Sequence, residues 1–559
     1  MTPEAAPAQV ALRPPEQVMR LARLGSFHAS RLSFMRILMR RMKAEGWTFD
    51  CPVFAIDDKG VGHAVLTAQT PTRTYALVAF AHDLPADQRS DRVIAEAWDC
   101  TYALHDGLPT SADIERLRKN VPFQEAGRVS EKELTLSRTN RSVRMFDHVV
   151  DRLAAGQQPD ENMILRVGYL MRTTAVYGSG KFGACDYRAI CDRPEFAAPF
   201  QAEMLTVFLI RDFVRRLAEH LARVRGGEKA VAMSATLARR LGIGNSTGLG
   251  MVPYLVNHPA LLNNWIAARE TALARVRALP GDESSFREFA ELVARAQANA
   301  AEWHSDHPLQ KEKLADLRPD LDALAAHLKA SPLTGLTPWD DLYQWGEGQL
   351  SCEGQEQLVS LMLEPHGAIV DDLADGMSLR SAAPRIDGAA SVAATRRALE
   401  QVYGWALKTD WMARDEQARV WYVSAEKLEP RLGERFEEPI ADYEQPLAPG
   451  RDAAVLYGAL ADWPDDAPIA DLLLARPEHR HMVRRIQIAQ TAPYGEIRDN
   501  TISATVLPID MLRCKLSFFG AGHFDPRSDR WVRINMFQNA PYPGELAAEE
   551  ADDWTYPKP

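Results

Sequence analysis

Two glycine-rich stretches hold the residue types in this chain that could bind and transform a small molecule. The first, YGSGKFG, begins at Tyr177 and places three glycines within six residues, with Lys181 among them. Glycines let successive backbone N–H groups turn toward one point without obstruction from a Cβ, and such a concave run of amides binds anions. We therefore predict that this stretch contacts a carboxylate or a phosphate. The predicted contact residues are Arg172, Gly178, Ser179 and Gly180.

A second glycine-rich stretch, LGIGNSTGLG, covers residues 241–250 and combines glycines with hydrogen-bonding side chains. One amide and two hydroxyl groups stand between its glycines, and these groups can donate to the oxygens of a bound anion. No strand pattern precedes the stretch, and an apolar run with a helical appearance precedes the first. We predict two loops that meet in space and share one ligand. The predicted contact residues of the second loop are Gly244, Asn245, Ser246, Thr247 and Gly248.

Neither stretch matches a nucleotide-binding signature. The GxxxxGK[ST] phosphate loop needs four residues between its glycines and a hydroxyl residue after its lysine, but Phe182 follows Lys181. The GxGxxG dinucleotide turn follows a strand and has a third glycine three positions after the second, but Thr247 occupies that position after Gly244. The sequence therefore leaves the cofactor unknown.

The charge pattern around both stretches favours an anion site. Residues 162–185 and 229–269 contain no Asp or Glu, although the 76 acids among 559 residues predict roughly five or six in the longer window. Like charges repel strongly in a partly desolvated site, so an anion site excludes carboxylates. Buried helical core also lacks acids and is the alternative explanation. Burial does not explain why the windows keep the basic residues Arg172, Lys181, Arg239 and Arg240.

Three residues near the stretches could transfer protons. Tyr177 lies four residues before Lys181, and a lysine ammonium favours the ionised form of a nearby phenol, so the pair can act as general acid and base. His258 precedes Pro259, a typical first residue of a helix, and helix N-termini also bind anions. Structural alternatives are a packed tyrosine and a helix-capping histidine. We predict Tyr177, Lys181 and His258 as catalytic residues.

Composition excludes several functional classes. The net charge of −11 opposes general binding to nucleic acids, and no apolar run approaches the roughly 18 residues of a membrane span. The six cysteines form no CxxC pair, which argues against a zinc ribbon and fits a reducing cytoplasm. His366, Asp371 and Asp372 have metal-binding side chains, but no second histidine stands at i+2 or i+4, so we predict no metal site. We expect a small anionic molecule as the ligand. A homodimer is the assembly that we consider.

The periodicity of the sequence predicts an α+β fold that is mainly helical. Residues 51–83 alternate apolar and polar residues around turn signals, which indicates a three-stranded meander, and residues 203–225 and 260–279 have helical periodicity. Residues 482–487, 514–519 and 531–537 resemble strands, the last two joined as a hairpin. We expect a disordered lead over 1–16, an α/β region over 17–156, a helical domain with both loops over 157–335, a helical region over 336–440, and an α+β region with a loose tail over 441–559.

Two classes of function fit these observations. The first is a cytoplasmic enzyme that holds a small carboxylate or phosphate between the two loops and acts by proton transfer, as a lyase or isomerase, or by cofactor-dependent redox chemistry. The second is a non-catalytic binding or scaffold protein whose glycines only let helices pack closely. The length of the chain and the chemistry of the loops favour the enzyme.

Overall fold

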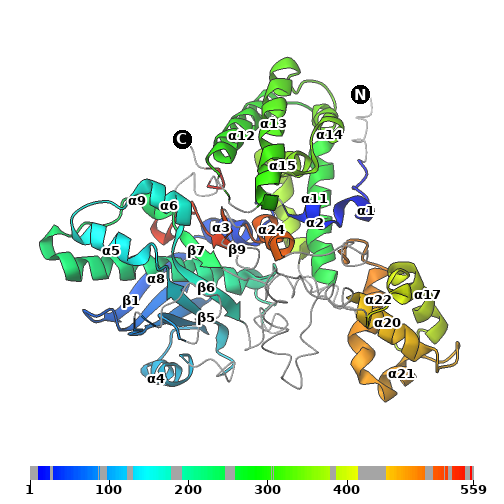
Figure 1. Cartoon of the computed structure of the whole chain (residues 1–559), viewed down its shortest axis with the longest axis horizontal. Helices are drawn as coiled ribbons and strands as arrows, with labels where there is room; N and C mark the ends of the chain where they lie inside the picture. Colours follow the sequence, from blue (N-terminus) through cyan, green and yellow to red (C-terminus); the bar gives the residue numbers. More distant parts are fainter. Residues whose placement is uncertain are drawn as a thin grey trace.

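The computed structural model has the predicted fold class, α+β and mainly helical (Figure 1). Among the described helices, none combines the length and apolarity that a bilayer crossing requires. The structure describes residues 10–25, 29–85, 97–122, 130–177, 192–245, 259–303, 308–377, 386–412, 449–497, 508–520, 523–526, 532–547 and 554–556, together with residues 87, 190 and 305.

One sheet forms the first layer of the molecule, and its strand order is β1-β2-β3-β4-β5-β6-β7-β9-β8. Neighbouring strands are antiparallel except for β6 and β7, which are parallel. The predicted meander is confirmed as β1, β2 and β3, with a tight turn at Asp57–Gly60 between the first two. The bounds are β1 Thr48–Ile56, β2 Gly62–Gln69, β3 Thr74–Ala81, β4 Cys100–Asp106, β5 Glu133–Arg141, β6 Tyr169–Tyr177, β7 Gly242–Asn245, β8 His523–Pro526 and β9 Val532–Met536.

The long helix α8 (Gln201–Gly226) is the crossover that parallel pairing requires, because it connects β6 to β7 and packs on one face of the sheet. Its Phe213 ring lies 5.7 Å from the ring of Tyr102 on β4, and its Thr206 hydroxyl lies 2.6 Å from that of Thr135 on β5. The smaller helix α4 (Ser111–Asn120) covers the other face of β3 and β4 through Leu117. The central strands are therefore covered by packed side chains.

The chain enters β6 from a short helix, α6 (Glu161–Val167), whose two ends are both defined by side-chain type. Asp160 caps its N-terminus by accepting a 2.8 Å hydrogen bond from the N–H of Met163. Gly168 ends the helix with a left-handed φ of 72°, a conformation that favours glycine. This C-cap turns the chain directly into β6.

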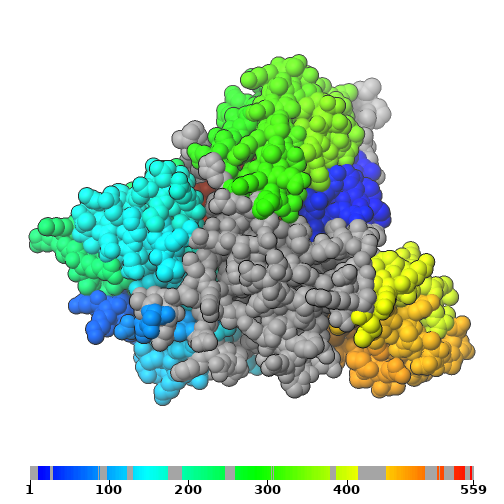
Figure 2. Space-filling model, viewed as in Figure 1, coloured from blue at the N-terminus to red at the C-terminus, as the bar shows by residue number. Residues whose placement is uncertain are grey.

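Two helical bodies complete the fold (Figures 1 and 2). The larger contains α11 (Pro259–Arg277), α12 (Glu283–Glu302), α13 (Pro308–Ala330), α14 (Pro338–Gln349) and α15 (Cys352–Met362), and it shares a hydrophobic core with the sheet, α3 (Phe34–Ala44) and α24 (Pro508–Phe519). The smaller contains α17 (Val392–Tyr403), α20 (Pro449–Leu460), α21 (Ile469–Ala475) and α22 (Arg480–Ala489) and has a core of its own.

Several predictions of secondary structure were wrong. Residues 482–487 lie in helix α22, and residues 514–519 lie in helix α24, so the hairpin partner of β9 is β8. Buried Met482, Val483 and Ile486 recur at helical spacing, and a short apolar run does not distinguish a strand from a buried helix. The predicted helices at 203–225 and 260–279 are confirmed as α8 and α11.

Candidate anion site at the carboxyl ends of two parallel strands

Strands β6 and β7 deliver both glycine-rich stretches to the same edge of the sheet. Their parallel register pairs Tyr169 with Gly242, Arg172 with Gly244, and Thr173 with Asn245. Parallel strands end at one edge, so the chain leaves β6 after Tyr177 and β7 after Asn245 on the same side of the sheet. The expectation that no strand precedes either loop is wrong, because a strand leads into each.

The structure places only part of the predicted site. Arg172 lies in β6 and is 2% exposed, and Gly244 and Asn245 lie in β7 rather than in a loop. Tyr177 is the last residue of β6, and only its backbone is described. The other predicted residues lie outside the described part of the chain: Gly178, Ser179, Gly180, Lys181, Ser246, Thr247, Gly248 and His258. That Gly180 and Gly248 meet in space stays a prediction.

Two glycines of β7 have a packing role. A Cβ on Gly244 would lie 2.8 Å from the ring of Tyr169, and one on Gly242 would lie 2.5 Å from the carbonyl oxygen of Met536. Both distances are too short for a side chain, so β7 approaches its neighbours closely because these positions are glycine. This close approach brings Gly244 directly beside Arg172.

The strands around β6 and β7 bury polar side chains, whereas β3 and β4 bury mainly apolar ones. Ser137 and Thr173 share a 3.1 Å hydrogen bond between β5 and β6. Burying polar groups costs free energy unless they are paired, so a sheet built only for packing would contain Val and Ile here. The buried polar residues of these strands are Glu133, Thr135, Ser137, Thr139, Asn140, Arg141, Arg172, Thr173, Asn245 and Asn535.

Asn535 is a fully buried member of this group whose side chain has incomplete hydrogen bonding. It lies on β9 opposite Gly244, is 0% exposed, and donates from Nδ2 to the carbonyl of Val167 at 3.4 Å. Its Oδ1 has no hydrogen-bond partner within the part of the chain that the structure describes. A buried acceptor of this kind is normally satisfied by water, a ligand or another part of the chain.

A second polar cluster lies at the same sheet edge, where β3 begins and β4 ends. Arg193, which follows the first glycine-rich stretch, donates to Asp106 at 2.8 Å and to the hydroxyl of Tyr75 at 3.4 Å. Tyr75 donates in turn to the buried carboxylate of Glu195. Burial, reinforced by this hydrogen bond, raises the pKa of Tyr75, so the phenol stays protonated. The chain is therefore held at this edge of the sheet before the first glycine-rich stretch by β6 and after it by the hydrogen bonds of Arg193.

Acidic residues at this edge are matched by arginines. Asp106 pairs with Arg193, and Glu133 at the start of β5 pairs with Arg116 of α4 at 2.9 Å. Their charge is therefore compensated locally. Sequence analysis missed Tyr75, Arg193 and Glu195, because residues about 120 positions apart meet only through the fold and no motif links them.

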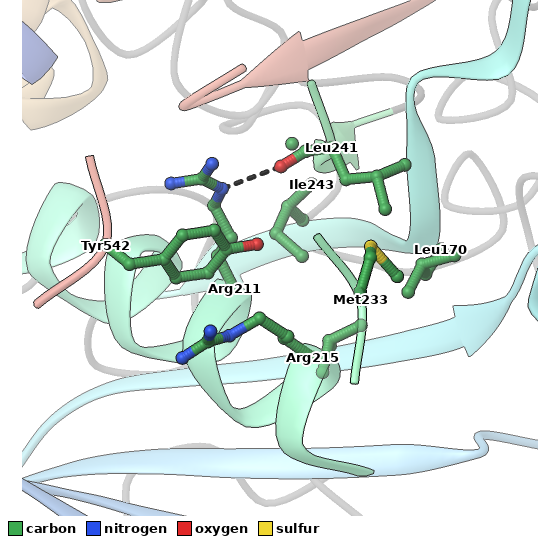
Figure 3. Close-up of a pocket in the computed structure, with 9 residues that line it drawn as sticks. Leu170, Arg211, Arg215, Met233, Leu241, Ile243 and Tyr542 are labelled. Atoms are coloured by element: carbon green, nitrogen blue, oxygen red, sulfur yellow. Dashed lines mark hydrogen bonds between the residues drawn. The ribbon is translucent and has the colours of Figure 1, made fainter. Parts of the chain in front are cut away.

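A small cavity lies at the opposite edge, where β6 and β7 begin (Figure 3). The ring of Tyr542 lies between the guanidinium groups of Arg211 and Arg215, whose Cζ atoms are 3.9 and 4.3 Å from its centroid (Figure 3). Arg211 donates to the carbonyls of Leu241, Arg239 and Ala540 at 2.7, 3.1 and 2.8 Å. These donors are already used, so the cluster fastens the C-terminal segment to α8 rather than offering a ligand site.

The two aspartates with metal-binding side chains noted in the sequence also form ion pairs with arginines. Asp371 pairs with Arg31 and Asp372 with Arg275, each at 2.8 Å. His366 instead packs edge-on against Trp339, with ring centroids 4.7 Å apart. Within the described residues, no group of three potential metal ligands comes together.

Comparison of the whole chain with known protein families, curated proteins and solved structures gives no match. The functional argument therefore depends on the site itself.

Proposed function

We propose that the protein is an enzyme acting on a small carboxylate or phosphate held at the carboxyl ends of β6 and β7. The parallel pairing of these strands supports the proposal most strongly, because it starts both glycine-rich stretches at one sheet edge. In open α/β sheets, ligands bind outside the carboxyl ends of the parallel strands, and we extend this rule to the parallel pair β6 and β7. Arg172 is buried in β6 beside Gly244, and we expect the amides of the glycine-rich stretches to add positive potential at this end of β7.

The proposed chemistry is proton transfer, as in a lyase or an isomerase, or cofactor-dependent redox chemistry. Tyr177 is the last residue of β6, Lys181 follows it four residues later in the sequence, and His258 immediately precedes α11 in the sequence. Tyrosine, lysine and histidine side chains can donate and accept protons. A bound anion and nearby cations can shift the pKa values of these side chains toward neutral pH. The polar sheet edge would orient the substrate for this transfer.

A scaffold or binding protein without catalysis is the second candidate. It is favoured by Gly242 and Gly244, whose close contacts with Met536 and Tyr169 give part of the glycine enrichment a packing cause. If the glycines serve only packing, the glycine-rich stretches would have no specific affinity for small anions. Anion binding therefore separates the proposed site from a packing role, and turnover of the bound anion separates an enzyme from a binding protein.

Titration calorimetry with inorganic phosphate and citrate as probes tests the proposal. We expect the wild-type protein to bind one of them and Lys181→Ala to bind it about tenfold or more weakly, since a hydrogen bond to a charged group contributes roughly 1.5–3 kcal/mol. Lys229→Ala is the matched control, because Lys229 is an exposed lysine in the turn after α8. Equal affinity in the folded Lys181→Ala variant would remove Lys181 from the site. No binding of either probe to the wild-type protein would favour the scaffold.

A further inference from the structure

The smaller helical body is a separately stabilised unit. Its four helices pack around apolar side chains such as Leu399, Leu456 and Ile486, none of which belongs to the main core. Arg485 and Glu496 form a buried ion pair at 2.6 Å inside it, and the hydroxyl of Tyr403 donates to the same carboxylate at 2.6 Å. A body with its own core moves as a unit relative to its neighbours unless specific contacts hold it.

The segment after α22 joins this body to the rest of the molecule. Glu496 belongs to the ion pair of the small body, but Tyr494, two residues earlier, belongs to the main core. The backbone N–H of Tyr494 donates to Oδ1 of Asn263 in the first turns of α11 at 3.1 Å. Gly495 lies against Pro259, the first residue of α11, where a Cβ would be 3.0 Å from the Pro259 carbonyl oxygen. Attachment therefore changes from one body to the other within three residues.

The N-terminal segment reaches the same joint. The hydroxyl of Tyr494 donates to the carbonyl oxygen of Arg13 at 2.6 Å. The Arg13 side chain is buried between α11 and α15, where it donates to Glu270 and Glu356, each at 2.8 Å. Two carboxylates hold this guanidinium firmly, so the carbonyl of Arg13 is a fixed acceptor.

We infer that Tyr494 is a latch that fixes the small helical body against α11 and the N-terminal segment. Opening the latch breaks the hydrogen bonds to Asn263 and Arg13 and lets the body turn about residues 492–495 as a hinge. The internal ion pair of Arg485 with Glu496 stays intact during this motion, because both partners move together.

Two variants weaken the latch without disturbing either core. Tyr494→Phe keeps the buried ring and removes only the hydroxyl that donates to Arg13. Asn263→Ala shortens a half-buried side chain and removes the oxygen that accepts from the N–H of Tyr494. Tyr457→Phe is the matched control, because the Tyr457 hydroxyl bonds to Glu400 within the small body. Spin labels on unnatural amino acids at Val455 of α20 and at Leu108 near the sheet report the distance between the bodies, and both positions are exposed.

Pulsed electron–electron double resonance on the full chain tests the inference. We expect Tyr494→Phe and Asn263→Ala each to broaden or shift the distance distribution between the labels, while Tyr457→Phe matches the parent protein. Circular dichroism should show unchanged helix content in all three. Unchanged distributions in both latch variants would overturn the inference, as would an equal broadening in Tyr457→Phe. The measurement needs no ligand, so its outcome is independent of the proposed enzymatic function.

Discussion

Individual buried polar residues in this protein differ in whether the fold already satisfies them. Arg211 has carbonyl partners on three sides, and Arg485 has a carboxylate, so both serve the structure. Asn535 on β9 instead keeps an acceptor without a partner among the described residues, close to Val167 where β6 begins. Satisfied groups stabilise a fold, whereas an unsatisfied buried group needs a further explanation. The parallel pairing of β6 and β7, rather than any one of these polar groups, is why we place the function at the carboxyl ends of the two strands.

His366 gives a prediction about stability and pH. Burial lowers its pKa to about 4; Asp282 partly opposes this effect and Arg31 reinforces it. The unfolded chain has an ordinary histidine pKa of about 6.5, so between pH 6.5 and 4 only the unfolded state takes up this proton, and stability falls as the pH decreases. We expect this loss to reach about 2 kcal/mol at pH 4, allowing for partial solvent screening.

Urea unfolding of the wild-type protein and His366→Gln at pH 7, 5.5 and 4 checks this effect. The free energy of unfolding should fall less steeply with pH in His366→Gln, because the variant lacks the titrating group. Other ionisable groups are common to both proteins and cancel in the comparison. Parallel pH profiles would show that His366 is readily protonated in the folded state.

At the scale of elements, the four-residue strand β7 decides the architecture of the site. Its glycines allow it to pack between β6 and β9, and this position starts the second glycine-rich stretch beside the first. We predict that Gly244→Ala destabilises the protein by about 1–3 kcal/mol, since an added methyl group would overlap the Tyr169 ring and force β7 to shift. Anion binding should weaken together with stability.

Gly348→Ala is the matched comparison for Gly244→Ala. Gly348 is exposed in α14, and a Cβ there would meet nothing within 4 Å. Alanine favours helix over glycine, so this variant should be more stable by about 0.5–1 kcal/mol. Thermal unfolding of both variants measures the two effects. A Gly244→Ala protein as stable as the wild type would mean that the close contact at β7 is easily relieved.

Local patterns predicted the meander and the long helices α8 and α11, because turn residues and apolar periodicity are properties of short segments. The same patterns failed for α22 and α24, whose short apolar runs fit a strand equally well. They also failed at β7, because a strand of four residues with two glycines has no strand signature. At the site, the register pairs Arg172 with Gly244, two residues chosen from different stretches of the sequence, and their role in binding stays a prediction. Tyr75 and Glu195, which no motif links, meet only through the fold.

At the scale of the whole molecule, the separate cores predict separable unfolding. Glu496→Gln would leave the Arg485 guanidinium buried without its carboxylate, and breaking a buried ion pair costs about 3–5 kcal/mol. This cost falls on the small helical body alone. We expect amide hydrogen exchange to become faster in α17 and α22 and to stay unchanged in α8. An equal loss of protection in α8 would show that both cores unfold as one.

The central claim is that a small anion binds where β6 and β7 end, and its position in a crystal tests this claim most directly. Crystals soaked in tungstate, a tetrahedral dianion with strong anomalous scattering, would reveal the bound site. We predict an anomalous peak for a tungstate whose oxygens lie within hydrogen-bond distance, about 3 Å, of backbone N–H groups in the segments that follow Tyr177 and Asn245, and the loss of this peak in Lys181→Ala crystals. A peak only elsewhere, such as beside Arg215, or one that persists unchanged in Lys181→Ala, would contradict the claim.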